Sequence, residues 1–272
     1  MATPIEEYYS NKIFLNAAVP LLKVIATDDP KINAKFKKVH CVYQISALDA
    51  NAPEGKLATH LVVNGDEWKV HAGKVAYRVG KQPFVELEFK SVEQLNAFFK
   101  GKIGPGTLPK MKGLNFIKEF LAFMSCLLRM SSVLSATTPP EKEADKALMV
   151  KCMFYLLTSG ISQLNKMEHP EIHEWALKSP DRVYALAVND HPESSAYVRV
   201  KAGKTRAGRG EYKRAMPFFT LRFSSYDAAL GTLLGIDDML DATKNGRIIM
   251  DGGPEFGATF GGFLLTIGDL AK

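Results

Sequence analysis

The hydrophobic and polar positions of this chain predict one order of elements twice. Each half opens with apolar residues mostly spaced by three to five, which is typical of a helix with one buried face. These positions are Ile13, Ala17, Leu21, Leu22 and Ile25 in the first half, and Leu148, Cys152, Tyr155, Leu156 and Ile161 in the second. Because a repeat of this length is a whole domain, the pattern predicts a tandem pair and not a solenoid.

Short runs rich in β-branched and aromatic residues follow the opening helix of each half. They cover residues 42–45, 61–63, 68–71 and 75–79 in the first half, and residues 183–188, 196–200 and 205–212 in the second. Turn residues, such as Asn64-Gly65-Asp66 and Gly203, separate the runs as they do in hairpins. We therefore expect an antiparallel meander in each half.

The clearest repeat is a strand signature over residues 83–91, which recurs over residues 217–225 at an offset of 134 residues. In the first copy, three apolar residues alternate with Glu86 and Glu88. Because successive strand residues point to opposite faces of a sheet, one face is wholly apolar and the other is partly charged. The apolar residues are Val85, Leu87 and Phe89. The pattern predicts a strand that is buried on one side.

Two helices are predicted after each signature. Ser91 and Ser224 are expected to cap the first of them, because a serine side chain can accept a hydrogen bond from the opening turn of a helix. The closing helix of the first copy covers residues 113–124 and carries three phenylalanines on one stripe. They are Phe116, Phe120 and Phe123, and their counterparts are Phe256, Phe260 and Phe263. Gly257, Gly261 and Gly262 weaken this closing helix in the second copy.

Small residues and a proline pair at positions 135–141 mark the joint between the copies. We expect two domains, over residues 1–137 and 138–272. A composition of 46% hydrophobic and 24% charged residues is ordinary for a globular protein. The element order predicts an α+β fold in which each domain has a small, mainly antiparallel sheet covered on one face by helices.

Charge divides unequally between the halves. Residues 1–140 hold 18 Lys and Arg against 12 Asp and Glu, and the remainder holds 17 of each, so the net charge of +6 belongs to the first half. That surplus is too dilute to indicate nucleic-acid binding, although it would permit transient contact with an anionic membrane surface. Three isolated cysteines and an N-terminus without a secretory pattern favour a cytoplasmic protein. No stretch reads as a membrane span.

Motifs that suggest chemistry have simpler explanations. Ala202-Gly203-Lys204-Thr205 lacks the earlier glycine of a phosphate-binding loop and reads as a hairpin turn. His169 and His173 have the spacing of a zinc pair, but a helix starting at Pro170 explains them better. The basic run 199–214 reads as a solvated strand face, with an anionic partner as the alternative. We expect no enzyme activity and no catalytic, metal or cofactor site.

The order of elements resembles the sterol carrier protein 2 (SCP2) like domains. The matching segments are residues 85–95, 100–102 and 110–113 in the first copy, and residues 220–227 and 247–252 in the second. The resemblance implies two tandem SCP2-like domains that bind a fatty acyl chain, a sterol-like molecule or another lipid without catalysis. The apolar cavity would lie between the sheet and the helices of each domain.

The expected ligand-binding residues are those that line the predicted cavities. They are Phe98, Phe116, Phe120, Phe123 and Met124 in the first copy, and Leu233, Phe256, Phe260 and Phe263 in the second. Two other functions stay open. The copies could form a pseudo-dimeric protein-interaction module without a ligand, or serve as accessory domains of an enzyme system. Because the second copy departs more from the pattern, a ligand is expected first in copy one.

Overall fold

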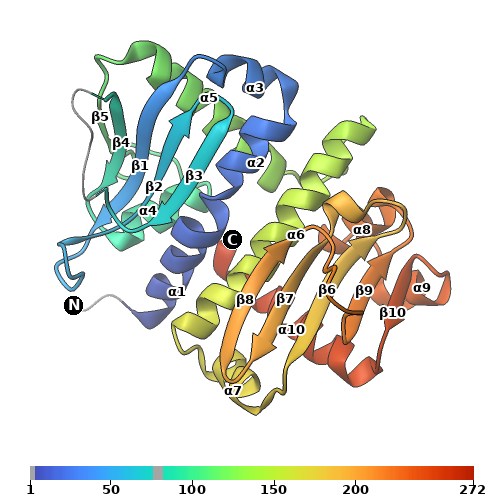
Figure 1. Cartoon of the computed structure of the whole chain (residues 1–272). Helices are drawn as coiled ribbons and strands as arrows, with labels where there is room; N and C mark the ends of the chain where they lie inside the picture. Colours follow the sequence, from blue (N-terminus) through green and yellow to red (C-terminus); the bar gives the residue numbers. More distant parts are fainter. Residues whose placement is uncertain (1–3, 76–81) are drawn as a thin grey trace. The chain divides into compact units, whose positions relative to one another are not determined.

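The computed structural model describes residues 4–75 and 82–272. The chain divides into two compact units (Figure 1). Unit 1 comprises the residues up to Ser132 together with Ala271 and Lys272, and unit 2 comprises Val133–Leu270. Each unit is α+β, with a five-stranded mixed sheet and helices packed along one face. The expected fold class is confirmed, and the predicted joint at residues 135–141 lies between the last helix of unit 1 and the first helix of unit 2.

Unit 1 opens with helical segments and continues into its sheet. The helices are α1 (Ile5–Ile13), a π-helical turn η1 (Phe14–Ala18), α2 (Leu21–Asp28), α3 (Pro30–Phe36), α4 (Val92–Phe99) and α5 (Ile117–Leu134). The strands are β1 (His40–Leu48), β2 (Lys56–Asn64), β3 (Glu67–Ala72), β4 (Phe84–Phe89) and β5 (Lys110–Lys112). Phe116, which was expected on the closing helix, lies in the turn just before α5.

The sheet of unit 1 has the order β3-β2-β1-β4-β5. Strands β1 to β3 form the expected antiparallel meander. The signature strand β4 instead pairs parallel to β1, with Tyr43 opposite Val85 and Ala47 opposite Phe89. This parallel pair was not predicted, because it requires β4 to return across the sheet. The predicted run at residues 75–79 lies, apart from Val75, outside the described residues.

Unit 2 repeats the same architecture. Its helices are α6 (Glu143–Lys166), α7 (Pro170–Lys178), a 3-10 turn η2 (Pro192–Ser194), α8 (Tyr226–Leu233), α9 (Met239–Lys244) and α10 (Pro254–Ala271). Its strands are β6 (Arg182–Val188), β7 (Ala196–Lys201), β8 (Lys204–Arg209), β9 (Phe219–Phe223) and β10 (Ile248–Asp251), in the sheet order β10-β9-β6-β7-β8. Of the predicted run 205–212, only the residues up to Arg209 belong to a strand, β8.

Local signals explain several boundaries. The Ser91 side chain accepts a hydrogen bond from the Gln94 backbone nitrogen at 3.2 Å and caps α4, as expected. In unit 2 the cap is Ser225, which accepts from the Ala228 nitrogen at 3.1 Å, so the prediction of Ser224 was wrong by one position. Ser225 is also the residue that the offset of 134 pairs with Ser91. The predicted hairpin turn at residues 202–203 and the helix start at Pro170 are both confirmed.

Helix α6 is the core helix of unit 2. By length and composition it could cross a membrane, and 67% of its most apolar window is buried inside the protein. It packs against β7 and β8, which accounts for its apolar surface without a membrane. Cys41, Cys126 and Cys152 are buried thiols that are not joined in disulfides. Burial raises the pKa of the Cys41 thiol to about 12, so this group is unreactive as a nucleophile.

Candidate functional site

The helix-facing side of the unit 1 sheet is a continuous apolar layer. On β4, the alternation places Val85, Leu87 and Phe89 on this side, and all three are buried. The neighbouring strand β1 contributes Tyr43 and Ile45, which are also buried. The predicted apolar face of the signature strand is confirmed, and helices α4 and α5 contact it through their aromatic side chains.

Two of the predicted ligand residues of unit 1 lie at opposite ends of this layer. Phe98 on α4 contacts Phe89, with ring centroids 5.2 Å apart. Phe123 on α5 is fully buried and stacks on Tyr43 at 4.5 Å. Because Val85 pairs with Tyr43 and lies four residues before Phe89, the two ends are about 13 Å apart along the strand. The structure thus places these residues on one face without bringing them together.

The other predicted residues of unit 1 leave the layer partly open. Phe116, Phe120 and Met124 are half-buried, as is Phe98. Phe120 and Met124 are on α5, close in sequence to the fully buried Phe123, and Phe116 lies just before this helix. Half-buried aromatic side chains at the edge of an apolar layer are groups that a hydrophobic ligand could cover.

The corresponding layer of unit 2 is more tightly closed. Phe260 on α10 is only 1% exposed and lies 5.6 Å from the Tyr184 ring, which occupies the place of Tyr43. Phe263 is also buried and contacts Trp175 at 5.1 Å. Phe256, at the start of α10, and Leu233, at the end of α8, are half-buried. Of the four predicted residues of unit 2, Phe260 and Phe263 therefore belong to its aromatic core.

A glycine on α10 permits part of this close packing. A Cβ atom at Gly257 would lie 3.0 Å from the Met250 sulfur and 3.1 Å from the Phe219 ring. At Gly261 and Gly262 a Cβ atom would meet nothing within 4 Å. Gly257 therefore allows a close approach to the helix backbone, and the three glycines do not interrupt α10, which is continuous from Pro254 to Ala271.

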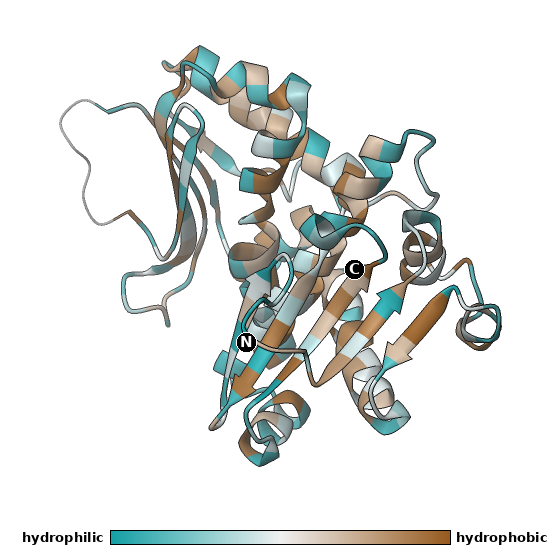
Figure 2. Cartoon of the chain, turned by 45° about the vertical axis from the view of Figure 1, so that its right-hand side comes forward, coloured by the Kyte–Doolittle hydropathy of each residue, from teal (hydrophilic) through white to brown (hydrophobic). Residues whose placement is uncertain are grey.

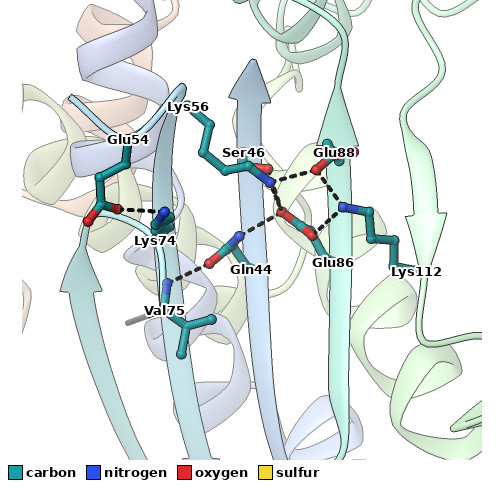
Figure 3. Close-up of polar contacts among 9 residues, drawn as sticks. All are labelled: Gln44, Ser46, Glu54, Lys56, Lys74, Val75, Glu86, Glu88 and Lys112. Atoms are coloured by element: carbon teal, nitrogen blue, oxygen red, sulfur yellow. Dashed lines mark hydrogen bonds and ion pairs between the residues drawn. The ribbon is translucent and has the colours of Figure 1, made fainter. Parts of the chain in front are cut away.

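The opposite, outer face of the unit 1 sheet carries a buried charge cluster (Figure 3). Glu86 on β4 is 3% exposed, and its carboxylate accepts hydrogen bonds from Gln44 Nε2 at 2.6 Å and Ser46 Oγ at 2.7 Å. Lys56 from β2 and Lys112 from β5 reach it from two sides, at 3.0 and 2.9 Å. We define these residues, together with Glu88, as the charge cluster; both lysines also bind Glu88, at 2.5 Å each.

Hydrogen bonding decides the ionisation of the charge cluster. Burial of Glu86 favours its protonated form, but hydrogen bonds from Ser46, Lys112, Lys56 and Gln44 outweigh burial and lower its pKa to about 2. Sequence reasoning placed Glu86 on the partly charged face and missed its burial. The alternation of Glu86 with apolar neighbours showed the face, but the two lysines come from strands 30 and 26 residues away.

The outer face of the unit 2 sheet has an open groove instead. It has a volume of about 410 Å³ and lies over β6 and β9, with Ala185, Ala187 and Thr220 among its lining residues. The segment that connects β8 to β9, residues 210–218, forms its other wall. Arg222 on β9 binds Asp251 on β10, with Nε and Oδ2 2.9 Å apart. No feature of the sequence alone indicated this groove.

A polar cluster at η2 holds hydroxyl, carboxylate and imidazole groups close together, as a catalytic site would. The hydroxyls of Ser194 and Tyr226 are 2.9 Å apart, and Glu193 accepts a hydrogen bond from Tyr226 at 3.3 Å. The His191 ring stacks on Tyr226. Burial raises the pKa of Tyr226, and Ser194 is fully buried, so neither hydroxyl is accessible to a substrate. The cluster holds η2 against α8.

Across residues 4–75 and 82–272, no group of three His, Cys, Asp or Glu side chains could hold a metal.

Comparisons with known proteins give weak matches. No family model and no curated protein sequence matches the chain. Among solved structures, the chain is similar to the conserved hypothetical protein TT1886 of Thermus thermophilus, which is described as a possible sterol carrier protein. The TM-score is 0.28 and the sequence identity is 18%, and the match covers 42% of this chain and 82% of that one. It is also similar to the inverting sec-alkylsulfatase Pisa1 of a Pseudomonas species, with a TM-score of 0.25 and 13% identity over 55% of this chain and 29% of that one. At these scores the comparisons give the chain neither a family nor an activity.

Proposed function

We propose that the protein binds an elongated hydrophobic molecule, such as a fatty acyl chain or a sterol-like lipid, and carries it without chemical change. The site proposed is the helix-facing aromatic layer of unit 1. The observation that carries the proposal is the half-open edge of this layer at Phe98, Phe116, Phe120 and Met124. In the same proposal, residues 1–137 and 138–272 are two SCP2-like domains of a cytoplasmic carrier.

The shape of the layer supports an elongated ligand. It runs for about 13 Å along β4, from the level of Phe123 to the level of Phe98. A ligand lying along it would contact aliphatic and aromatic side chains throughout, such as Leu87 and Ile45, once the α5 edge moved outward. Such a surface offers few hydrogen-bonding groups, so selectivity among apolar molecules would be low.

The energetics are adequate for a carrier. Burying about a dozen methylene groups contributes roughly 10 kcal/mol, at about 0.8 kcal/mol each. Association costs several kcal/mol through lost translational and rotational freedom. With a cost of about 4 kcal/mol, the remaining ~6 kcal/mol corresponds to a Kd of tens of micromolar, which suits a protein that must also release its ligand.

Unit 1 is the favoured carrier because the equivalent layer of unit 2 is filled. Phe260 and Phe263 are both buried there, whereas Phe116, Phe120 and Met124 on the α5 side of unit 1 are half-buried. The surplus of Lys and Arg in the first half of the chain also suits transient contact with an anionic membrane, from which a lipid could be loaded.

The test is native mass spectrometry of freshly purified full-length protein, compared with a denatured spectrum. We expect a co-purified lipid mass that disappears on denaturation, and displacement of a bound fluorescent fatty acid by unlabelled oleate. Phe120→Ala should weaken fatty-acid binding by about tenfold, since it removes apolar contact area from the proposed site. The matched control is Phe256→Ala, a half-buried phenylalanine at the start of α10 in unit 2, which should leave binding unchanged.

Two results would contradict this proposal. One is a native mass equal to the denatured mass together with no binding of the fluorescent fatty acid. The other is equal weakening by Phe120→Ala and Phe256→Ala, which would mean that the binding is not specific to unit 1. The first result would leave the pseudo-dimeric interaction module as the better explanation of the apolar faces.

A further inference from the structure

The groove of unit 2 and the charge cluster of unit 1 occupy the same place in the repeated fold. In unit 1 the parallel pair sets Gln44 opposite Glu86 and Ser46 opposite Glu88. In unit 2 the same pair sets Ala185 opposite Thr220 and Ala187 opposite Arg222. The offsets of 141 residues on the first strand and 134 on the second, which follow from the sequence repeat, make these positions equivalent.

The difference between the two places is side-chain size. In unit 1, Gln44 and the two lysine side chains lie on the outer face, and each binds the Glu86 carboxylate. In unit 2, alanine side chains and Thr220 form a shallow floor, so the equivalent space is open. Its volume of about 410 Å³ is within the range of pockets that bind small organic molecules.

An aromatic contact fixes one wall of the groove. The Tyr197 ring lies over Gly208, where a Cβ atom would be 2.0 Å from the ring, and contacts the Tyr212 ring at 5.0 Å. Tyr212 lines the groove. Phe218 also borders it, but its ring contacts Tyr184 and Phe256 of the helix-facing layer, with centroids 5.8 and 4.7 Å apart. A ligand would therefore enter a site in which the Tyr212 wall is already held in place.

Two hydroxyls of the lining are available for hydrogen bonding. Ser195 and Thr220 are 5% and 7% exposed. Neither side-chain hydroxyl has a hydrogen-bond partner in the part of the chain that the structure describes, and both residues line the groove. A ligand in the groove could therefore donate a hydrogen bond to these hydroxyls or accept one from them.

The groove continues into a second, acidic hollow of about 360 Å³. The two share Ala187, Ser195, Glu211 and Arg222. The second hollow adds Asp190. Arg222 is neutralised by Asp251, whereas Glu211 and Asp190 form no ion pair with any described residue. The site therefore combines an apolar floor with a net negative end.

We propose that unit 2 has a separate binding site, on its outer sheet face, for a small apolar molecule that carries a protonated amine. The apolar body would lie on Ala185 and Ala187, against the wall that Tyr212 forms. The ammonium group would lie beside Glu211, within reach of the Ser195 hydroxyl. This site is independent of the lipid site proposed for unit 1, because it lies in the other unit and on the opposite face of the sheet.

The test uses ligands with one apolar body and opposite charge. Uniformly ¹⁵N-labelled full-length protein is titrated with 2-phenylethylamine and, separately, with 3-phenylpropionate, and backbone amide shifts are followed. We expect shifts confined to residues 185–187, 195–196 and 210–222. We also expect the amine to bind about two- to fivefold more tightly than the acid, which is the size of effect for an exposed charge pair.

Three variants make the result decisive. Ala187→Leu fills the floor and should abolish the shifts, whereas Ala258→Leu, on the exposed surface of α10, should leave them unchanged. Glu211→Gln, a change at an exposed side chain, should remove the preference for the amine and keep the binding of the apolar body. Absence of shifts at the groove in the unaltered protein, or equal affinity for amine and acid, would overturn the proposal.

Discussion

The outer faces of the two sheets show how one backbone arrangement can be closed or open. In unit 1, Glu86 collects four hydrogen bonds and the face is filled by charged side chains. In unit 2, the strands have the same order and the equivalent parallel register, yet Ala185 and Ala187 leave a groove. At these equivalent positions, long polar side chains are buried in unit 1, whereas short side chains line a groove in unit 2.

The two faces also differ in the direction of an ion pair. In unit 1 the acid is on the signature strand and the base on the edge strand, as Glu88 and Lys112. In unit 2 the base is on the signature strand and the acid on the edge strand, as Arg222 and Asp251. The hydropathy view of the chain shows hydrophilic and hydrophobic bands alternating along the strands of the unit 2 sheet (Figure 2). The repeat therefore preserves the alternation of polar and apolar positions while it changes the sign of the charges.

The largest effect is expected from Glu86→Ala. It leaves Lys56 and Lys112 without their buried partner, and breaking a buried charge pair costs about 3–5 kcal/mol of unfolding free energy. The equivalent change in unit 2, Thr220→Ala, removes one hydroxyl and should cost less than about 1 kcal/mol. Urea unfolding followed by circular dichroism measures both. Equal losses in the two variants would contradict the contrast between a closed and an open face.

The acid stability of unit 1 should depend on the same carboxylate. The pKa of Glu86 is lowered to about 2 in the folded protein from an ordinary value near 4.5. A group with a lowered pKa stabilises the fold fully above its unfolded pKa, and this contribution is lost as pH falls toward the folded pKa. Unit 1 should therefore lose about 3 kcal/mol between pH 4.5 and pH 2. Calorimetric scans across this range measure it.

The control for the acid experiment is Glu86→Gln. This variant should lack the contribution of the Glu86 carboxylate, so its melting temperature should fall less steeply over the same pH range. Identical pH dependence in the variant and the unaltered protein would show that the charge cluster does not control acid unfolding. Other carboxylates of the chain titrate in both proteins, so only the difference between them is interpreted.

The smallest effect is expected from Arg222→Ala. The ion pair of Arg222 with Asp251 is partly exposed, and such pairs contribute about 0–1 kcal/mol. Thermal melting should therefore shift by only a few degrees. A loss as large as that of Glu86→Ala would mean that the outer faces of the two units depend equally on their charges.

The sequence pattern was informative where structure is local. Alternation identified the apolar face of β4, and the Ser91 cap followed from its spacing to Gln94. The misplaced cap at Ser224 arose because two adjacent serines offer the same local signal, and only the repeat offset distinguishes them. Local signals therefore predicted the elements well and their exact ends less well.

Features that join distant segments were not predictable from the same pattern. The parallel pairing of β1 with β4 depends on a crossover, and the burial of Glu86 depends on Lys56 and Lys112 from other strands. The groove depends on the small side chains of Ala185 and Ala187. In a single sequence, an alanine in a strand does not indicate whether a groove lies above it. Comparing the two copies position by position becomes possible only when the registers are known.

The opposite direction of the two ion pairs has a consequence for the correct assembly of a tandem chain. Similar neighbouring domains are at risk of exchanging equivalent strands while they fold. If β10 paired with β4, Asp251 would lie beside Glu86 and Glu88; if β5 paired with β9, Lys112 would lie beside Arg222. Like charges on adjacent strands are destabilising. The reversed ion pair thus disfavours pairing of each edge strand with the sheet of the other unit.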